Sequence, residues 1–341
     1  MSTAIKKTGT VILALLACIA MAFALTSCGG SQSSSSSSQA SSSAAKDSVK
    51  IAIVQLADNS AFDEMSSAFK AELANQGYVE GQNVTYDMKS AQGDSSTLQT
   101  ICGNLSSEGY DLVVGIVTPA TQAVVNANPG CPVVFISVAN PVGSGIMSSM
   151  DTPDKNATGT SNVIPVDQIF TLADQLTPNY GTVGLLYCSG ENNAVLTVQK
   201  AKEYLDKQGI PYVEQSVANS AEVQQAAQSL ASKCGMIYIP VDSTVQSAMP
   251  QVVEAATAAK IPVYGSDPVM VKSGALACIS VSNTQLGTRS AQMAAQILSG
   301  TPVSEIPAEA LTDYQYVING QTAATLGVTV PTGDQYKVIG Q

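Results

Sequence analysis

The chain of 341 residues contains no histidine and no tryptophan, and aromatic residues make up only 5% of it. The lack of histidine removes the commonest general base, the Ser-His-Asp and Cys-His arrangements, and every metal motif that contains histidine. The seven cysteines show no C-x-x-C spacing, so neither a zinc site nor a thioredoxin-like motif is indicated. We therefore predict a protein that is not an enzyme and that uses no metal or other cofactor.

Positive charge is also scarce, since 15 lysines and arginines stand against 26 acidic residues and give a net charge of −11. An acidic surface of this kind disfavours nucleic acid and capture by anionic lipid. The sequence has no P-loop, EF-hand or H-E-x-x-H pattern, and Gly143-Ser144-Gly145 lacks the third glycine of a dinucleotide fingerprint. Binding of a small molecule is the class of function that these absences leave.

Only one long apolar run is present, from Val11 to Leu25, and it follows Lys6 and Lys7. The run is short for a membrane span and is typical of an export signal. Its end, Leu25-Thr26-Ser27-Cys28, resembles the lipobox of bacterial lipoprotein signals. The resemblance implies cleavage before Cys28 and diacylation of the Cys28 sulfur with fatty acyl chains such as palmitate.

Residues 29–47 are a low-complexity stretch of Ser, Gln, Ala and Gly that cannot bury a core, so they are predicted to form a tether. We thus expect a signal peptide (1–27), a lipidated Cys28 with its tether (28–47), and a folded body outside the cytoplasmic membrane. The lipid would anchor the body to the membrane without spanning it.

Two strand–helix–strand units of similar design occupy residues 110–142 and 235–269. In each unit two apolar, β-branched runs flank a segment of helical period, which is typical of parallel strands buried on both faces. Asn140-Pro141-Val142 at the end of the first unit corresponds to Asp267-Pro268-Val269 at the end of the second. Ile51–Val54 and Val183–Leu186 extend the similarity upstream. The repeat predicts two similar α/β domains.

The predicted fold is therefore α/β, with two doubly wound parallel-sheet domains joined by a hinge. The first domain is expected at 49–162 plus 284–302 and the second at 163–283 plus 303–331, followed by a tail at 332–341. This arrangement crosses between the domains three times, which suits closure around a ligand.

Ligands of open α/β sheets bind beyond the carboxyl ends of the strands, so the polar segments at those ends are the candidate site. Helix capping is the competing explanation for each of them. In the first domain the candidates are Asn59, Ser60, Phe62, Thr118, Pro119, Ala120, Asn140 and Ser161, and in the second Ser189, Glu191, Asn192, Asp242, Thr244, Ser266 and Asp267.

Four of these candidates have proposed roles. Thr118 and Pro119 begin a helix whose free amides could bind a carboxylate. Asp242 is the acid that we favour as the partner of a ligand ammonium group, with capping of its own helix as the alternative. Phe62 is placed to form a wall for an apolar or aromatic group, with packing against its own helix equally expected.

Five cysteines remain in the body: Cys102, Cys131, Cys188, Cys234 and Cys278. Most of them border apolar strands, where a small buried side chain is the ordinary interpretation. A disulfide is compatible with the expected location, and its pairing is not readable from the sequence.

Several stretches in order resemble the ABC-transporter substrate-binding lipoproteins of the tryptophan/tyrosine (TrpX-like) type. They include Glu80-Gly81-Gln82-Asn83-Val84, Ala91-Gln92-Gly93-Asp94, Thr118-Pro119-Ala120, Asn140-Pro141-Val142-Gly143, Thr158-Gly159-Thr160-Ser161, Glu222-Val223-Gln224-Gln225-Ala226, Asp242-Ser243-Thr244-Val245 and Thr322-Ala323-Ala324. The resemblance covers roughly Val49 to Pro331. Asn140 and Asn162 differ from it, because they stand where an acid is expected in many relatives.

This resemblance implies a periplasmic-binding-protein type I fold and a monomer that captures a small molecule in its cleft and delivers it to a membrane permease. An aromatic amino acid such as tryptophan or tyrosine is the expected ligand. The alternative from a different class is a cell-surface receptor or adhesin lipoprotein whose cleft is vestigial.

Overall fold

The computed structural model describes residues 48–340. The predictions for the signal peptide, for Cys28 and for the tether lie outside this range. Within the described range, no helix combines the length and the apolar character that crossing a membrane requires. The described residues form two α/β lobes, each built on its own sheet.

The sheet of the first lobe has six strands, all paired in parallel. Their spatial order is β11 (Glu309–Ala310), β5 (Ala157–Ser161), β4 (Val133–Val138), β3 (Leu112–Ile116), β1 (Val49–Gln55) and β2 (Val84–Ser90). Its helices are α1 (Ser60–Asn75), α2 (Ser95–Asn104), α3 (Val117–Ala127) and α10 (Asn283–Leu298), with a 3-10 turn at Leu105–Ser107.

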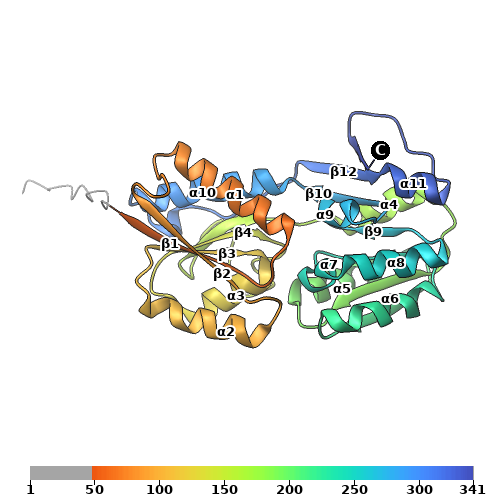
Figure 1. Ribbon diagram of the computed structural model, residues 1–341, viewed down its shortest axis with the longest axis horizontal. Coiled ribbons are helices and arrows are strands. Elements are labelled where there is room, and N and C mark those ends of the chain that lie inside the picture. The colour runs from red at the N-terminus through yellow and green to blue at the C-terminus, as the bar shows by residue number, and fades with distance from the viewer. Residues whose placement is uncertain (1–47, 341) are drawn as a thin grey trace, which may run out of the picture. The chain divides into compact units, whose positions relative to one another are not determined.

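Both faces of this sheet are buried, and strand alternation divides the core in two. Ile51 and Ile53 of β1 join a cluster with Phe69 of α1 and Leu286 of α10. Ala52 and Val54 join the opposite cluster, which includes residues of α2 and α3. Figure 1 shows α1 and α10 side by side, so that a helix from the C-terminal part of the chain covers the N-terminal lobe.

The sheet of the second lobe has seven strands, and only the β10–β12 pair among them is antiparallel. Their order is β13 (Tyr336–Ile339), β12 (Tyr314–Asn319), β10 (Ala277–Val281), β9 (Val263–Gly265), β8 (Met236–Tyr238), β6 (Val183–Cys188) and β7 (Tyr212–Val217). Its helices are α4 (Val166–Leu176), α5 (Asn192–Gln208), α6 (Val223–Ala231), α7 (Ser243–Ser247), α8 (Met249–Ala259), α9 (Pro268–Lys272) and α11 (Gly320–Leu326), with a 3-10 turn at Ser220–Glu222. A further 3-10 turn, Val303–Glu305, lies between α10 and β11 of the first lobe.

The chain passes between the two sheets after β5, after β10 and after β11.

Two details differ from the domain boundaries predicted from the sequence. Strand β13 pairs with β12, so residues 332–341 are not a simple tail. Strand β11 pairs with β5 of the first sheet, although residues 303–331 were expected in the second lobe. Both are short edge strands, and a two- or four-residue strand carries too little alternation to be recognised.

Candidate ligand-binding site

A strained turn joins β3 to α3 in the first lobe. Val117 has φ of +58°, which is costly for a β-branched residue and places the start of α3 close against the sheet. Gly115 permits this approach, because a Cβ atom there would lie 2.6 Å from Thr121 Oγ1. Strained backbone of this kind occurs often at functional sites, and it fixes the position of the Thr118 segment.

Thr118, Pro119 and Ala120 form the first turn of α3, where Thr118 and Ala120 are buried and Pro119 is half-buried. Thr118 Oγ1 accepts a hydrogen bond from the amide of Ala139 at 3.3 Å, which connects this turn to the end of β4. Ser161 Oγ donates to the carbonyl of Val138 at 2.8 Å. These side chains hold the ends of β3, β4 and β5 together at one edge of the sheet.

The remaining first-lobe candidates have local partners. Asn140 Oδ1 accepts from the amide of Gly143 at 2.9 Å, and Asn59 Oδ1 caps α1 by accepting from the amides of Ala61 and Phe62. Ser60 is exposed. Phe62 is 2% exposed and belongs to the core cluster beneath α1 and α10, so the structure places its ring in packing inside the lobe.

In the second lobe two buried carboxylates stabilise the first turn of α7. Asp242 Oδ1 accepts from the amide of Val245 at 2.8 Å, and Oδ2 accepts from the amide of Cys188 at 2.5 Å. Glu191 accepts from the amides of Ser243 at 3.0 Å and Thr244 at 2.8 Å, and from Thr244 Oγ1 at 2.8 Å. Burial and the nearby charge of Glu191 raise the pKa of Asp242 well above its usual range.

These contacts correct the expected role of Asp242. The residue is fully buried and both of its oxygens are occupied by backbone amides. Its side chain therefore caps α7. Glu191 accepts from the first amides of α7 and from Thr244 Oγ1, so its carboxylate and the Thr244 hydroxyl are also occupied at that helix end.

Other second-lobe candidates lie close to these caps. Ser189 is exposed and its Oγ donates to the carbonyl of Val217 at 3.2 Å. Asn192 Nδ2 donates to the carbonyl of Gly143 at 3.3 Å, a hydrogen bond that joins the two lobes. Asp267 caps α9 through the amide of Val269 at 2.7 Å, and burial raises its pKa to about 6. Ser266 is buried and its Oγ has no hydrogen-bond partner.

Ser266 is one of several buried polar side chains near strand ends that lack a partner. Such atoms are rare in native proteins, because each unpaired group costs about 1–3 kcal/mol. In the described chain they include Gln55 Oε1, Asn59 Nδ2, Asn162 Oδ1, Asn193 Oδ1, Tyr238 OH, Gln246 Nε2, Ser266 Oγ and Asn283 Oδ1. They come from both lobes, and they indicate that the strand ends of the two lobes form the candidate site.

A small cavity of about 30 Å³ lies between the lobes within this region. It is lined by Ala139 and Asn140 after β4, by Asn162, Val163, Ile164 and Val166 at the crossover from β5 to α4, and by Asn193, Leu196, Thr197, Lys200, Tyr238 and Val241 of the second lobe. Of the predicted site residues only Asn140 lines it. Asn193 lies in the polar segment that follows β6 but was not among the named candidates, which stop at Asn192. Tyr238 was missed, because the apolar run continues beyond the end of β8 to Val241 and no polar strand end stands out there.

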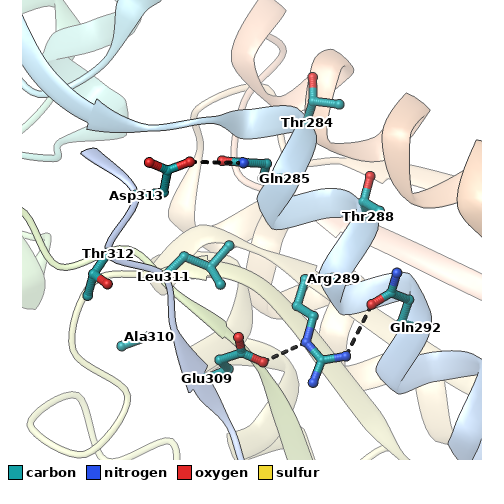
Figure 2. A pocket seen from close by; sticks show the side chains of 10 residues that line it. All are labelled: Thr284, Gln285, Thr288, Arg289, Gln292, Glu309, Ala310, Leu311, Thr312 and Asp313. Atoms are coloured by element: carbon teal, nitrogen blue, oxygen red, sulfur yellow. Dashed lines mark hydrogen bonds and ion pairs between the residues drawn. The ribbon is translucent and has the colours of Figure 1, made fainter. Parts of the chain in front are cut away.

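A larger hollow of about 440 Å³ lies between α10 and residues 309–313. Figure 2 shows that its charged side chains are already paired: Arg289 Nε contacts Glu309 Oε2 at 2.5 Å, and Gln285 Nε2 donates to Asp313 Oδ2 at 3.2 Å. Because these groups satisfy each other, the hollow offers less evidence of a ligand than the cavity between the lobes.

The described residues contain no group of His, Cys, Asp and Glu side chains arranged to hold a metal ion. Cys102, Cys131, Cys188, Cys234 and Cys278 are all free thiols, so the disulfide left open by the sequence does not form in this part of the chain. Burial raises the pKa of the Cys131 thiol to about 11, which makes it a poor nucleophile.

Comparison with known proteins identifies the class. Residues 50–333 match the family model described as ABC transporter substrate binding protein, so this chain belongs to that family. The chain is 32% identical over 334 residues to the tyrosine-binding protein of Clostridioides difficile strain R20291, covering 98% of this chain and 96% of that protein.

Two solved structures are similar as well. The ABC domain in complex with L-Trp from Streptococcus pneumonia has a TM-score of 0.80 and 32% identity, covering 83% of this chain and 96% of that one. The ligand-free, open structure of a substrate binding protein with adhesive properties from Clostridium difficile has a TM-score of 0.66 and 34% identity, covering 85% and 99%.

These findings confirm the resemblance and the predicted fold class of two α/β lobes of the periplasmic-binding-protein type I kind. They also confirm that the chain is a binding protein and not an enzyme. Substrate-binding proteins of ABC transporters are extracytoplasmic and bind small molecules.

Proposed function

We propose that the protein is an extracytoplasmic lipoprotein of an ABC importer that captures an aromatic amino acid between its lobes and delivers it to the permease. The observation that carries the proposal is the set of buried, unpartnered polar side-chain atoms at strand ends of both lobes. A ligand that bonds to these atoms would remove the cost of leaving them unpaired.

The relatives support the chemical class of the ligand. One of them is a tyrosine-binding protein, and another was solved with L-Trp. Both share about a third of their residues with this chain over nearly their full length. Membrane attachment through acylated Cys28 completes the proposal, because it keeps the body beside the permease.

The ligand carboxylate is assigned to the first turn of α3. The amides of the first turn of a helix lack intrahelical acceptors and attract anions. Thr118 and Ala120 lie in this turn, which the strained Val117 holds in place. Exposed Ser189 faces solvent at the end of β6 and provides a hydroxyl from the second lobe.

Capture requires the lobes to separate, because the present cavity of about 30 Å³ holds only a water-sized group. Three crossovers connect the lobes, and few residues in each would need to change conformation. The hydrogen bond from Asn192 to Gly143 is then a contact of the closed state, broken when the lobes part.

A thermal-shift screen of residues 48–341 tests the proposal against the twenty amino acids and sets of sugars, nucleosides and peptides. A ligand that binds only the folded state raises the melting temperature, with a stabilisation of about 2.7 kcal/mol at 100 times its Kd. We expect a shift with tyrosine, tryptophan or phenylalanine. A shift with another class of metabolite, and none with amino acids, would refute the ligand class.

An adhesive surface role is the second candidate, and the relative with adhesive properties is the observation in its favour. In this role the outer surface would bind a partner, independent of the cleft. A failure of every small molecule in the screen, combined with saturable binding of the protein to a host-cell or bacterial surface, would favour this candidate over the importer.

A further inference from the structure

The cavity between the lobes contains three unpartnered polar atoms whose side chains are almost fully buried. Asn162 is 4% exposed, Asn193 2% and Tyr238 0%. Asn162 Oδ1, Asn193 Oδ1 and the Tyr238 hydroxyl have no hydrogen-bond partner, and all three residues line the cavity. They come from the crossover after β5, from the first turn of α5 and from the end of β8.

Each asparagine side chain already makes one hydrogen bond, and that bond shows which of its two polar atoms remains for a ligand. Asn193 Nδ2 donates to the carbonyl of Val241 at 2.7 Å. A carbonyl oxygen only accepts, so the amino group must face Val241 and Oδ1 must be the free atom. Asn162 Nδ2 donates to Ser137 Oγ at 3.3 Å, and in this orientation of the amide Oδ1 is the free atom. With both amides in these orientations, the cavity presents two acceptors and a hydroxyl that can also accept.

We infer that this cavity binds the ammonium group of a zwitterionic α-amino acid, an inference that rests on the proposed function. An ammonium group has three donors and no acceptor, which matches three acceptors. It is also about the size of a water molecule, and the cavity of about 30 Å³ holds one group of that size.

The acceptors for the ammonium group are neutral, because the nearby acids already accept hydrogen bonds from backbone amides. Glu191 and Asp242 bind backbone amides at the start of α7. Among the residues that line the cavity in the described chain, Lys200 is the one with a charge, and it is exposed. Its positive charge disfavours a simple amine and favours a zwitterion, whose carboxylate offsets the charge.

The test is calorimetric titration of the purified full-length protein with tyrosine, tryptophan, tyramine and 3-(4-hydroxyphenyl)propionate, the analogue of tyrosine without an amino group. The wild-type protein should bind tyrosine at least about 100-fold more tightly than the analogue, because the analogue leaves buried acceptors unpaired. Tyramine should bind more weakly than tyrosine, since it lacks the carboxylate.

Tyr238→Phe removes one acceptor and nothing else. It should weaken tyrosine binding about 10-fold and leave the analogue within about twofold, since only the ammonium loses a partner. The melting temperature of the ligand-free variant should stay the same or rise, because the lost hydroxyl is unpaired. Asn162→Leu should also weaken tyrosine, whereas Asn162→Asp, which keeps an oxygen there, should retain binding.

Tyr264→Phe is the matched control. Tyr264 is equally buried, its hydroxyl is paired with Thr177 Oγ1 at 2.7 Å, and it does not line the cavity. This variant should lower the melting temperature and leave both affinities unchanged.

Equal affinities of the wild-type protein for tyrosine and its analogue would overturn the inference and leave the proposed function intact, with the cavity holding only a water. If neither tyrosine nor tryptophan binds but another amino acid does, the aromatic class fails, and the same comparison with that amino acid decides the subsite. A protein that binds no amino acid overturns both.

Discussion

Glu191 and Asp242 place two buried carboxylates at the first turn of α7, where each accepts hydrogen bonds from backbone amides. Asp242 also accepts from the amide of Cys188, and so connects the end of β6 to this helix. Unpaired helix amides carry partial positive charge, which stabilises negative charge on the pair, whereas burial and the nearby Glu191 raise the pKa of Asp242. The pair thus acts as a structural clamp that fixes the end of β6 to the start of α7.

The clamp predicts a stability loss on truncation of Glu191. In Glu191→Ala the amides of Ser243 and Thr244 lose their acceptor in a buried place, and the free energy of unfolding should fall by about 2 kcal/mol. Glu191→Gln keeps one acceptor oxygen and should lose about half as much. Urea denaturation measures both.

Glu203→Ala, at an exposed position of the helix α5 that begins directly after Glu191, is the control and should change stability by less than about 0.5 kcal/mol. A Glu191→Ala protein with unchanged stability but a large loss of affinity would show that Glu191 contacts the ligand instead.

Because the hydrogen bond between Asn192 and Gly143 joins the two lobes, we expect its loss to weaken ligand affinity without lowering folding stability. Asn192→Ala removes a contact of about 1 kcal/mol from the closed state, so Kd should rise about fivefold, mainly through faster dissociation. Stopped-flow kinetics measure the rate, with exposed Gln199→Ala on the same helix as control. A slower association at unchanged dissociation would contradict this role.

The close packing at Gly115 predicts a penalty for any side chain. In Gly115→Ala the added Cβ would lie 2.6 Å from Thr121 Oγ1 and 2.8 Å from Thr121 Cα, so α3 must shift. We expect a loss of about 2 kcal/mol in the free energy of unfolding. Affinity should fall as well, since Thr118 and Ala120 move with the helix.

Gly103→Ala is the matched control for this substitution. Gly103 lies in α2, and a Cβ there would meet nothing within 4 Å. It should stabilise the protein by about 0.5 kcal/mol, because alanine is the better helix former. Equal effects of the two substitutions would refute the packing argument.

Asp267 predicts how stability depends on pH. Burial raises its pKa from 3.8 to about 6, so the folded state binds the proton more tightly than the unfolded state. This contribution to stability is fully present below pH 3.8 and is lost as pH rises through about 6. The shift corresponds to at most about 3 kcal/mol.

Asp267→Asn keeps a capping oxygen for Val269 and removes the charge. Relative to the wild-type protein it should be more stable at pH 8, by up to about 3 kcal/mol, and about equally stable at pH 4. Urea denaturation at both pH values measures the difference. Asp206→Asn, at an exposed position of α5, should show no such difference. A pH-independent effect of Asp267→Asn would contradict the assignment.

Much of the fold was predictable because local patterns in the sequence indicate its strands and helices. Strand β3, helix α3 and strand β4 lie within the unit predicted at residues 110–142, since apolar β-branched runs between turn residues are a local signal. The repeated unit indicated two lobes. Strands β11 and β13 were not predicted, because their pairing depends on neighbours distant in the sequence.

The sequence by itself determined the class of the protein: two doubly wound lobes, no histidine chemistry and polar residues at strand ends. It left capping and ligand binding as alternatives for each polar residue, because both use the same residue types. Only the tertiary structure decided between them. It gave Asp242 two amide partners, packed Phe62 into the core, and left the oxygens of Asn162 and Asn193 without a donor. Partners are contributed by segments far apart in the chain, so their presence or absence is a property of the folded molecule.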